Sequence, residues 1–357
     1  MDTKDLCEKN KIVKMYSGSH AYGMALPTSD VDFRGIFCCD PINLLTPFFP
    51  VREYEDTSEE DTKYFELSHF VQKALDCNPN IVELLWTDDS DIVFRTPAYD
   101  LLKENRHKLL STKIAHTTTG YAYAQLKRIK GHNKWINDPQ PVQPPTQMQF
   151  ISLVQNFTST KLFKFDPEKI NKGYKLLHYG NNIYGVYEDQ KSSLFNKDGS
   201  LCSQYTKEQQ NDFIGDGVGR KTPLLLVKYN AEEYKQSKNK HAQYWEWKNN
   251  RNEKRAVLEE EHGYDTKHAS HLVRLLRMGE EALTQGEIIV KRPDAAELLD
   301  IRHGKKTYKE LVEYAEFMEN KIKNELYNNS VLPKKPNIKI AADLILKVQN
   351  LCWEAND

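Results

Sequence analysis

The chain has 357 residues, of which 39% are hydrophobic and 28% are charged. This composition is typical of a folded globular protein and excludes a mainly disordered chain. The 50 basic and 51 acidic residues give a net charge of −1, so the overall charge predicts neither a nucleic-acid partner nor a membrane partner.

The sequence contains no recognisable membrane or secretion signal. No apolar run approaches the roughly 20 residues that a membrane helix needs, and the first residues lack the apolar segment of a signal peptide. The six cysteines include no CxxC pair, which gives little support for a structural zinc site. We therefore expect a cytoplasmic protein with no membrane partner. Its length predicts two domains, or one domain with an insertion.

The N-terminal region predicts short strands joined by tight connections. Residues 11–17, KIVKMYS, have the pattern of a strand that runs into Gly18 and Ser19. A short helical stretch and a proline turn follow, and the alternating apolar residues over 31–37 predict a second strand. Residues 62–67, TKYFEL, predict a third strand.

Helical patterns begin after these strands. Ser68 is the predicted N-cap of one helix, and a longer helix is predicted over residues 107–130. The prolines in DPQPVQPPT, residues 138–146, block both a helix and an inner strand, so this segment predicts a linker. Strand-like pieces such as YKLLHYG, NIYGVY and PLLLVKY follow, and helical periodicity returns from residue 254.

The most informative pattern is YSGSHAYGMALPTSDVDFRG, which spans residues 16–35. A glycine-serine pair at a strand end, followed by a helix N-terminus, can hold the terminal phosphates of a nucleotide. Asp30 and Asp32 are two residues apart, so a strand would place both carboxylates on one face. Such a pair can bind Mg²⁺, and a two-metal site can activate a hydroxyl and stabilise departing pyrophosphate. The alternative is a capped turn with two solvent-facing aspartates.

This combination resembles the signature of the DNA polymerase β-like nucleotidyltransferase superfamily, in which GS is followed after about ten residues by an acidic pair. Further strings are similar to those of predicted nucleotidyltransferases from bacteria and phages, including proteins grouped with RNA-repair genes. The similarity covers the N-terminal region and most of 254–310, and it is weak over 150–250. These strings are DCNPNIVELLW, GYAYAQLKRI and YDTKHASHLVRLLRMGEEALTQGEIIVKRPDAAELLDIR.

The resemblance implies an α+β fold. We expect a polymerase β-like catalytic domain over residues 1–100, with a small mixed sheet and helices. Residues 101–137 and 254–357 would form a helical domain. Residues 138–253 would form the Pro-rich linker and an inserted mixed or β-rich module.

The superfamily usually has a third carboxylate on a following strand. Asp61 and Glu66 are the candidates, and their opposite parity allows only one of them to face the metals in a regular strand. We favour Asp61, because family members often carry aspartate at the start of this strand. Glu66 stays as the alternative.

Four basic residues are candidates for contacts with the nucleotide. Arg34 shares a strand face with the two aspartates, where it would contact phosphate or brace the carboxylates, unless it forms only a surface salt bridge. Lys267, His271 and Arg274 recur at helical spacing, so they share one helix face. A cationic stripe there would neutralise a triphosphate, and a solvated helix face is the alternative. Glu83 and Glu287 also lie in the strings that resemble the family, and we predict a structural role for both.

A second basic stretch runs from Lys127 to Lys134 and includes His132, with Trp135 next to it. Such a mixture can contact an RNA backbone and stack on a base. The alternative is a solvated helix end, where lysines are favoured by the helix dipole.

These features predict a Mg²⁺-dependent transferase that moves a nucleoside monophosphate from a nucleoside triphosphate (NTP) to an acceptor hydroxyl, with release of pyrophosphate. Two Mg²⁺ ions are expected, and Mn²⁺ is the substitute. The expected acceptor is an RNA or tRNA end; the alternatives are a protein or small-molecule acceptor, or a non-catalytic nucleotide- or RNA-binding module. The sequence indicates neither the base nor the oligomeric state, and it does not separate a phage from a bacterial origin.

Overall fold

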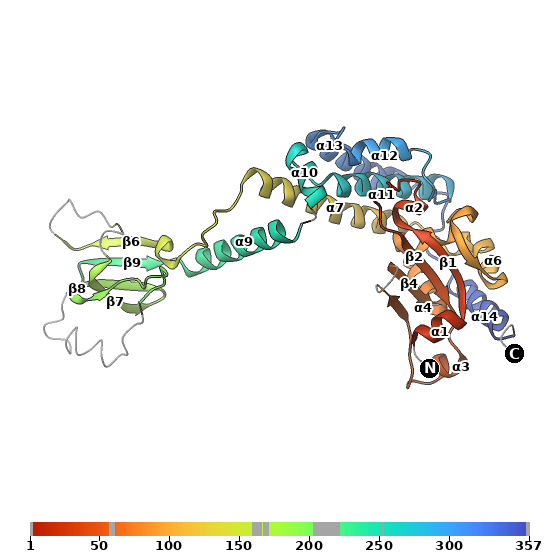
Figure 1. The fold of residues 1–357 in the computed structure, drawn as a ribbon, viewed down its shortest axis with the longest axis horizontal. Coiled ribbons are helices and arrows are strands. Elements are labelled where there is room, and N and C mark those ends of the chain that lie inside the picture. Colours follow the sequence, from red (N-terminus) through yellow and green to blue (C-terminus); the bar gives the residue numbers. More distant parts are fainter. Residues whose placement is uncertain are drawn as a thin grey trace. The chain divides into compact units, whose positions relative to one another are not determined.

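The chain folds into two compact units (Figure 1). Unit 1 contains Met1–Asn137 together with Glu253–Asp357, and unit 2, Asp138–Asn252, is inserted between these two segments. The computed structural model describes residues 3–56, 61–158, 166, 171–202, 222–251 and 253–354.

Unit 1 is built on a five-stranded mixed sheet with the strand order β3-β4-β2-β1-β5. Strands β1 and β2 pair antiparallel, whereas β2 and β4 run parallel. The N-terminal ends of β2 and β4 therefore lie side by side. The strands are β1 (Lys11–Ser17), β2 (Asp32–Phe37), β3 (Glu53–Asp56), β4 (Asp61–Glu66) and β5 (Ile92–Arg95).

Helices join the sheet in one buried core. Met15 and Ile36 of the sheet belong to the same apolar cluster as Phe70 of α4, Leu102 of α6 and Val348 of α14. Burial of such side chains is the main favourable contribution to folding. The helices and turns of this region are α1 (Thr3–Lys9), α2 (Gly18–Ala21), α3 (Pro41–Leu45), α4 (Leu67–Leu75), α5 (Pro79–Val82), η1 (Glu83–Leu85), η2 (Asp89–Asp91), α6 (Pro97–Glu104), η3 (Arg106–Leu109) and α14 (Ile338–Glu354).

The remaining helices of unit 1 are arranged around α7 and α11. These two helices approach closely at Gly279, where a Cβ atom would lie 2.5 Å from the Thr118 hydroxyl. Leu272 and Leu276 of α11 are buried in the common core, as its apolar periodicity predicts. These helices are α7 (Ile114–Asn137), α10 (Glu253–His262), α11 (Thr266–Gln285), α12 (Ala295–Arg302), α13 (Tyr308–Asn320) and the π-helical turn η5 (Lys321–Leu326).

The long helix predicted over 107–130 begins and ends later than expected. Leu110 adopts an extended conformation (φ −88°, ψ 150°), which interrupts the helix after a short 3₁₀ turn. The Ser111 hydroxyl then accepts a hydrogen bond from the Lys113 backbone N–H, and the amide of Thr112 donates to the carbonyl of Pro333. The new helix therefore starts only at Ile114.

Unit 2 contains a four-stranded antiparallel sheet with the order β6-β9-β8-β7 and a polar helix, α9. Leu176, Val186 and Val227 form part of its own apolar core. Trp245 Nε1 of α9 donates a hydrogen bond of 2.9 Å to the carbonyl of Pro141, which fixes the proline-rich segment to this helix. The elements are η4 (Gln147–Phe150), β6 (Ile151–Asn156), β7 (Lys172–Gly180), β8 (Ile183–Ser193), β9 (Leu225–Tyr229) and α9 (Ala231–Asn250).

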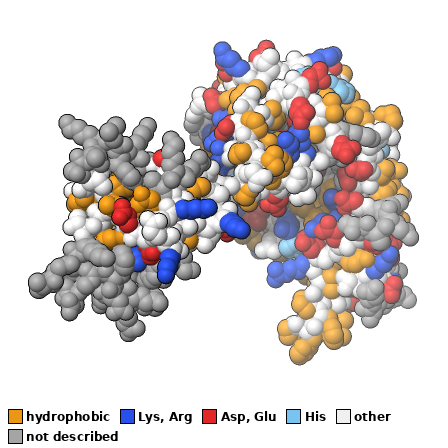
Figure 2. Space-filling model, turned by 60° about the vertical axis from the view of Figure 1, so that its left-hand side comes forward, with side chains coloured by type: hydrophobic (Ala, Val, Ile, Leu, Met, Phe, Trp, Pro, Cys, Tyr) orange, Lys and Arg blue, Asp and Glu red, His pale blue; other side chains and the backbone are white. Residues whose placement is uncertain are grey.

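The arrangement is an α+β fold, as predicted, with helices and two sheets. Acidic and basic side chains are interspersed on the molecular face in Figure 2, in agreement with the net charge of −1. None of the helices in the described ranges combines the length and apolar character that a bilayer crossing requires.

Candidate active site

The turn after β1 forms one wall of the candidate site. The strand ends at the buried Ser17, and Gly18 then takes a left-handed conformation with φ +61°. A Cβ atom at Gly18 would lie only 2.7 Å from Oδ2 of Asp32. Ser19 is half-buried in the short helix α2, where its carbonyl accepts a hydrogen bond from Met24 N–H. Glycine is therefore required twice at position 18, for the backbone angle and for the close approach to a carboxylate.

Three aspartates surround the start of β2. Asp32 is the first residue of this strand and lies in register with Ser17 of β1 on one side and with Asp61 of β4 on the other. Burial raises the pKa of Asp32, and the negative charges of Asp61 and Asp30 raise it further, while Arg34 opposes the shift. Asp30 is exposed and precedes the strand, so the two predicted aspartates do not share a regular strand face. The charge of Asp30 nevertheless acts on Asp32.

The two candidates for the third carboxylate lie at opposite ends of β4. Asp61 is opposite Asp32, whereas Glu66 is opposite Phe37, which is five residues further along β2 or roughly 16 Å away. Glu66 is buried and caps α4, because its Oε2 accepts hydrogen bonds of 2.7 and 3.0 Å from the backbone N–H groups of Ser68 and His69. The N-cap predicted at Ser68 is therefore wrong, and the geometry brings Asp61, not Glu66, to Asp32.

Arg34 lies beside the aspartates. Its Nη1 is 3.4 Å from Oδ1 of Asp61 and donates a hydrogen bond of 2.7 Å to the carbonyl of Phe33. The Arg34 side chain keeps 26% of its surface exposed, so solvent screens this ion pair. Arg34 is thus ion-paired with Asp61, and it is also one of the residues that line the pocket.

The predicted cationic stripe on α11 is not a free cationic surface. Arg274 is buried, with Nη1 3.1 Å from Oε2 of Glu83 and its guanidinium carbon 3.8 Å from the centre of the Tyr22 ring. The Tyr22 hydroxyl donates a 2.8 Å hydrogen bond to Glu83, so the three side chains form a buried network. Burial, assisted by the charges of Arg274 and Lys267, lowers the pKa of His271 to about 3, so this imidazole is neutral near pH 7.

The network on α11 thus corrects the expectation for two of the three residues. Arg274 forms an ion pair with Glu83, and His271 is uncharged near pH 7. Lys267 is half-buried at the first turn of the helix. None of the three is among the described residues that line the pocket next to Asp32. Helical spacing placed them on one face correctly, but that face is mostly packed against other elements.

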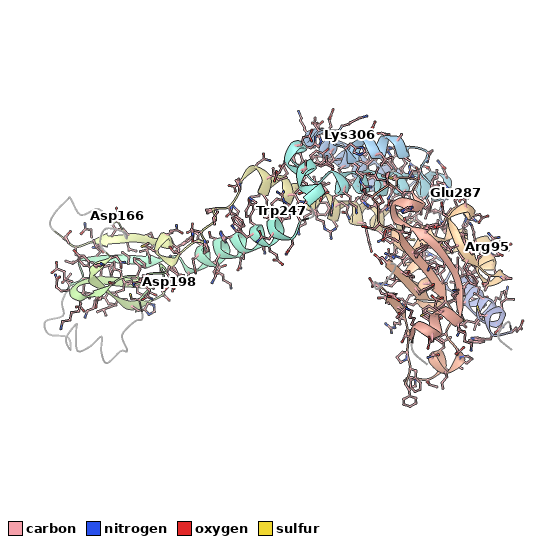
Figure 3. All side chains as sticks on the ribbon, viewed as in Figure 1. Arg95, Asp166, Asp198, Trp247, Glu287 and Lys306 are labelled. Carbon is pink, nitrogen blue, oxygen red and sulfur yellow. The ribbon has the colours of Figure 1, made fainter. Side chains whose placement is uncertain are left out.

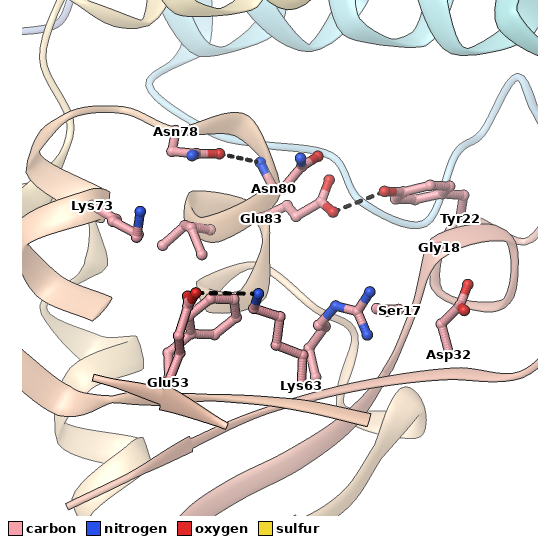
Figure 4. A pocket seen from close by; sticks show the side chains of 13 residues that line it. Ser17, Gly18, Tyr22, Asp32, Glu53, Lys63, Lys73, Asn78, Asn80 and Glu83 are labelled. Atoms are coloured by element: carbon pink, nitrogen blue, oxygen red, sulfur yellow. Dashed lines mark hydrogen bonds and ion pairs between the residues drawn. The ribbon is translucent and has the colours of Figure 1, made fainter. Parts of the chain in front are cut away.

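A pocket of about 460 Å³ opens beside Asp32 (Figure 4). The sequence analysis missed two of its basic residues, Lys63 and Lys73. Lys63 ion-pairs with Glu53 at 3.4 Å and with Glu55 at 3.3 Å. Lys63 shares the parity of Asp61 in β4, which was the available signal; Lys73 comes from α4 and had none. The pocket is lined by Ser17, Gly18, Tyr22, Asp32, Arg34, Glu53, Lys63, Phe65, Lys73, Asn78, Asn80, Ile81 and Glu83.

The pocket therefore has two chemically different walls. The Asp32 carboxylate stands at the start of β2, next to Asp61 in register on β4, and basic side chains from β2, β4 and α4 line the pocket beside it. Asn78 caps α5 through its own side chain and shares the rim with Asn80 (Figure 4). Such a site suits a ligand that carries both negative charge and a bound cation.

Glu287, labelled in Figure 3, is not among the residues that line this pocket, and it ties two segments of unit 1 together. The indole N–H of Trp86 donates a hydrogen bond to its carboxylate, and His107 Nε2 lies 3.4 Å from Oε1. These contacts agree with the prediction that Glu287 is structural.

A glycine-serine turn and paired strand carboxylates on a mixed sheet are the features expected of the polymerase β type of nucleotidyltransferase. Residues 8–138 match the protein family RlaP, described as the RNA repair pathway DNA polymerase beta family. This match confirms the resemblance, and it covers the sheet, the pocket and all of α7.

A phage protein extends the similarity beyond this segment. The chain is 26% identical over 325 residues to an uncharacterized 38.9 kDa protein from the nrdC-mobD intergenic region of Enterobacteria phage T4. The alignment covers 85% of this chain and 86% of the phage protein. No solved structure matches the chain.

Proposed function

We propose that this protein is a Mg²⁺-dependent nucleotidyltransferase that moves a nucleoside monophosphate from an NTP to an acceptor hydroxyl. One observation carries the proposal: Asp32 and Asp61 lie in register on parallel strands, beside the close approach of Gly18 to Asp32. The family match over residues 8–138 supports the same reaction class.

The carboxylates suit a divalent cation. Carboxylate oxygens are the ligands that Mg²⁺ prefers, and nucleotide phosphates commonly complete its coordination. The raised pKa of Asp32 reflects burial and repulsion from Asp61 and Asp30, and a bound cation would relieve that repulsion. We assign these three aspartates as the ligands of two Mg²⁺ ions, with Mn²⁺ as a substitute. When bound, the ions would neutralise phosphate charge and lower the pKa of the attacking hydroxyl.

The protein residues position the substrates. Gly18 and Ser19 would hold the terminal phosphates at the turn, because the backbone there approaches the carboxylates without a side chain. Arg34, Lys63 and Lys73 would balance the triphosphate charge from the other walls of the pocket. Arg274 would act indirectly, through the network that holds Tyr22 and Glu83 in place, and the neutral His271 would bring no charge to the nucleotide.

The reaction exchanges one phosphorus–oxygen bond for another. The acceptor oxygen attacks the α-phosphorus, the bond between the α-phosphorus and the bridging oxygen breaks, and pyrophosphate leaves with that oxygen. The proton of the acceptor passes to a carboxylate, for which Asp61 is the most suitable group, since 45% of its side chain is exposed. Positioning and fixed charges would supply most of the rate enhancement.

We propose an RNA or tRNA end as the acceptor, on the strength of the family's description. A protein side chain or a small molecule is the second candidate acceptor, because the pocket chemistry is the same for all three. The experiment incubates full-length protein with each α-labelled NTP, Mg²⁺ and pooled small RNA. The matched variants are Asp30→Asn/Asp32→Asn and Asp76→Asn, an exposed aspartate outside the pocket.

Label that enters RNA with the wild type and with Asp76→Asn, but not with the double variant, would establish the transferase and its nucleotide. Label on the protein would identify a polypeptide as the acceptor. No transfer, together with no Mg²⁺-dependent binding of any NTP, would contradict the catalytic proposal and leave a non-catalytic module.

A further inference from the structure

A second group of metal-ligating side chains lies outside the pocket. His132 comes from α7, Glu259 from α10, and Asp265 directly precedes α11. One donor atom from each of the three lies within 4.8 Å of the others. The two carboxylate side chains keep only 4% of their surface exposed, and that of His132 keeps 18%. Buried carboxylates are usually paired with a positive charge or bound to a metal ion, so both arrangements have to be considered for this cluster.

The distances within the cluster fit a small tetrahedral ion. Nδ1 of His132 lies 3.5 Å from Oδ2 of Asp265 and 3.8 Å from Oε1 of Glu259. Zn²⁺ binds histidine nitrogen and carboxylate oxygen at roughly 2.0–2.2 Å in tetrahedral geometry, which separates neighbouring ligand atoms by about 3.4 Å. Small shifts of the side chains would therefore bring all three donors into the coordination shell.

His268 holds Asp265 in the manner of an outer-shell partner. Arg128 Nη1 lies 3.3 Å from His268 Nε2, and because an arginine can only donate, Nε2 is the acceptor. The proton of a neutral His268 is then on Nδ1, which lies 2.9 Å from Oδ2 of Asp265. The backbone N–H of His268 donates to the other oxygen, Oδ1, at 2.9 Å. Metal-binding side chains are commonly fixed by such hydrogen bonds.

We propose that His132, Glu259 and Asp265 bind one Zn²⁺ ion, with solvent as the fourth ligand. The ion joins α7, α10 and α11 at the two places where the chain leaves unit 1 for unit 2 and returns from it. Its role is to stabilise this junction within unit 1. This site is independent of the proposed transferase centre, because the two share no residue.

The cluster also replaces the RNA contact considered for His132. Its ring stacks on Trp135 with the centroids 5.9 Å apart, and its Nδ1 faces the two carboxylates. The alternative to a metal is a protonated imidazole that forms ion pairs with these carboxylates. Metal content separates these two arrangements directly.

The experiment titrates chelator-treated, full-length protein with Zn²⁺ in an excess of Mg²⁺. The chain also carries Asp30→Asn/Asp32→Asn, which removes two of the three aspartates assigned to the transferase centre and so weakens Zn²⁺ uptake there. We expect one Zn²⁺ per chain and a rise in the unfolding temperature. Glu259→Gln and His132→Gln should abolish both effects, and Glu260→Gln, at an exposed neighbour on α10, should change neither. His268→Ala removes the imidazole whose Nδ1 lies 2.9 Å from Oδ2 of Asp265, and it should weaken Zn²⁺ binding by roughly 10–100-fold, as loss of an outer-shell contact does.

Co²⁺ provides a test that needs no variant in the cluster, in case those variants fail to fold. Co²⁺ in this background should show the visible absorption of a four-coordinate ion, and Zn²⁺ should displace it. A chain that takes up no Zn²⁺ or Co²⁺ would overturn the proposal. The same holds for Zn²⁺ uptake that folded Glu259→Gln and His132→Gln proteins retain in full.

Discussion

Two regions of unit 1 place charged residues in opposite environments. At the N-terminal ends of β2 and β4, Asp32 and Asp61 lie opposite each other on parallel strands, and burial together with the charge of Asp61 raises the pKa of Asp32. On α11, Arg274 is buried against Glu83 and Tyr22, and His271 is neutral. Neighbouring carboxylates suit a cationic ligand, whereas a buried carboxylate paired with a guanidinium suits a structural role. Residue type alone does not distinguish these cases; the neighbours do.

The largest expected effect concerns the stability of the α11 network. Arg274→Met leaves the Glu83 carboxylate buried without its guanidinium partner. We expect the free energy of unfolding to fall by about 3–5 kcal/mol, measured by urea denaturation. The double variant Glu83→Gln/Arg274→Met should recover most of this loss, because both charges are then removed. Equal losses in the single and double variants would contradict a structural ion pair.

A substitution at the N-terminal ends of β2 and β4 should have the opposite effect on stability. Asp32→Asn removes one of two repelling carboxylates, so label transfer should fall at least about 100-fold while the fold remains intact. In the absence of divalent cations, the unfolding temperature at neutral pH should rise. A parallel loss of activity and stability would show that Asp32, like Arg274, supports the fold.

Alanine variants of Gly18 and Gly23 distinguish the effect of backbone strain from the effect of a contact with the Asp32 carboxylate. Gly18→Ala should cost about 1–2 kcal/mol in stability because of its positive φ, and it should also reduce transfer, since the new Cβ meets Asp32. Gly23→Ala is the matched control, because Gly23 has φ +69° but is near only the Lys291 side chain. Equal activity of the two variants would remove the special role of the Gly18–Asp32 contact.

The pH dependence should be the smallest effect. The pKa of Asp32 is raised in the folded protein, so in the cation-free protein its contribution to stability is fully present below the unfolded-state pKa. That contribution is lost as pH rises through the folded-state pKa. Transfer should decline as pH falls into the same window, because Asp32 becomes protonated. His271→Gln should leave this profile unchanged, since the pKa of His271 is already about 3. A shifted pH profile of transfer in His271→Gln would show that a group on α11, and not Asp32, is responsible for the titration.

Local patterns in the sequence predicted a substantial part of this fold. Strand periodicity over 11–17 and 62–67 matches β1 and, within one residue, β4, and the turn at Gly18 follows β1 as predicted. Helix α9 was missed because its sequence is almost entirely polar, with Tyr244 as its buried residue among those described. Its apolar periodicity was therefore too weak to predict a helix.

The long-range contacts were beyond single-sequence patterns. The pairing of Glu83 with Arg274 joins residues 191 positions apart, and helical spacing does not indicate such a partner. Likewise, strand parity could not choose between Asp61 and Glu66. The register between β2 and β4 places Asp61 at Asp32, and the capping of α4 uses Glu66.

The most direct test of the central claim compares the two ends of β4. Pyrophosphate release and label transfer would be measured for Asp61→Asn and Glu66→Gln, with folding checked by circular dichroism. We predict that Asp61→Asn loses at least about 100-fold in transfer, whereas Glu66→Gln, in which the amide oxygen can still cap α4, stays within about tenfold of wild type. Transfer that survives in Asp61→Asn but is lost in a folded Glu66→Gln protein would contradict the assignment of the site to the paired ends of β2 and β4.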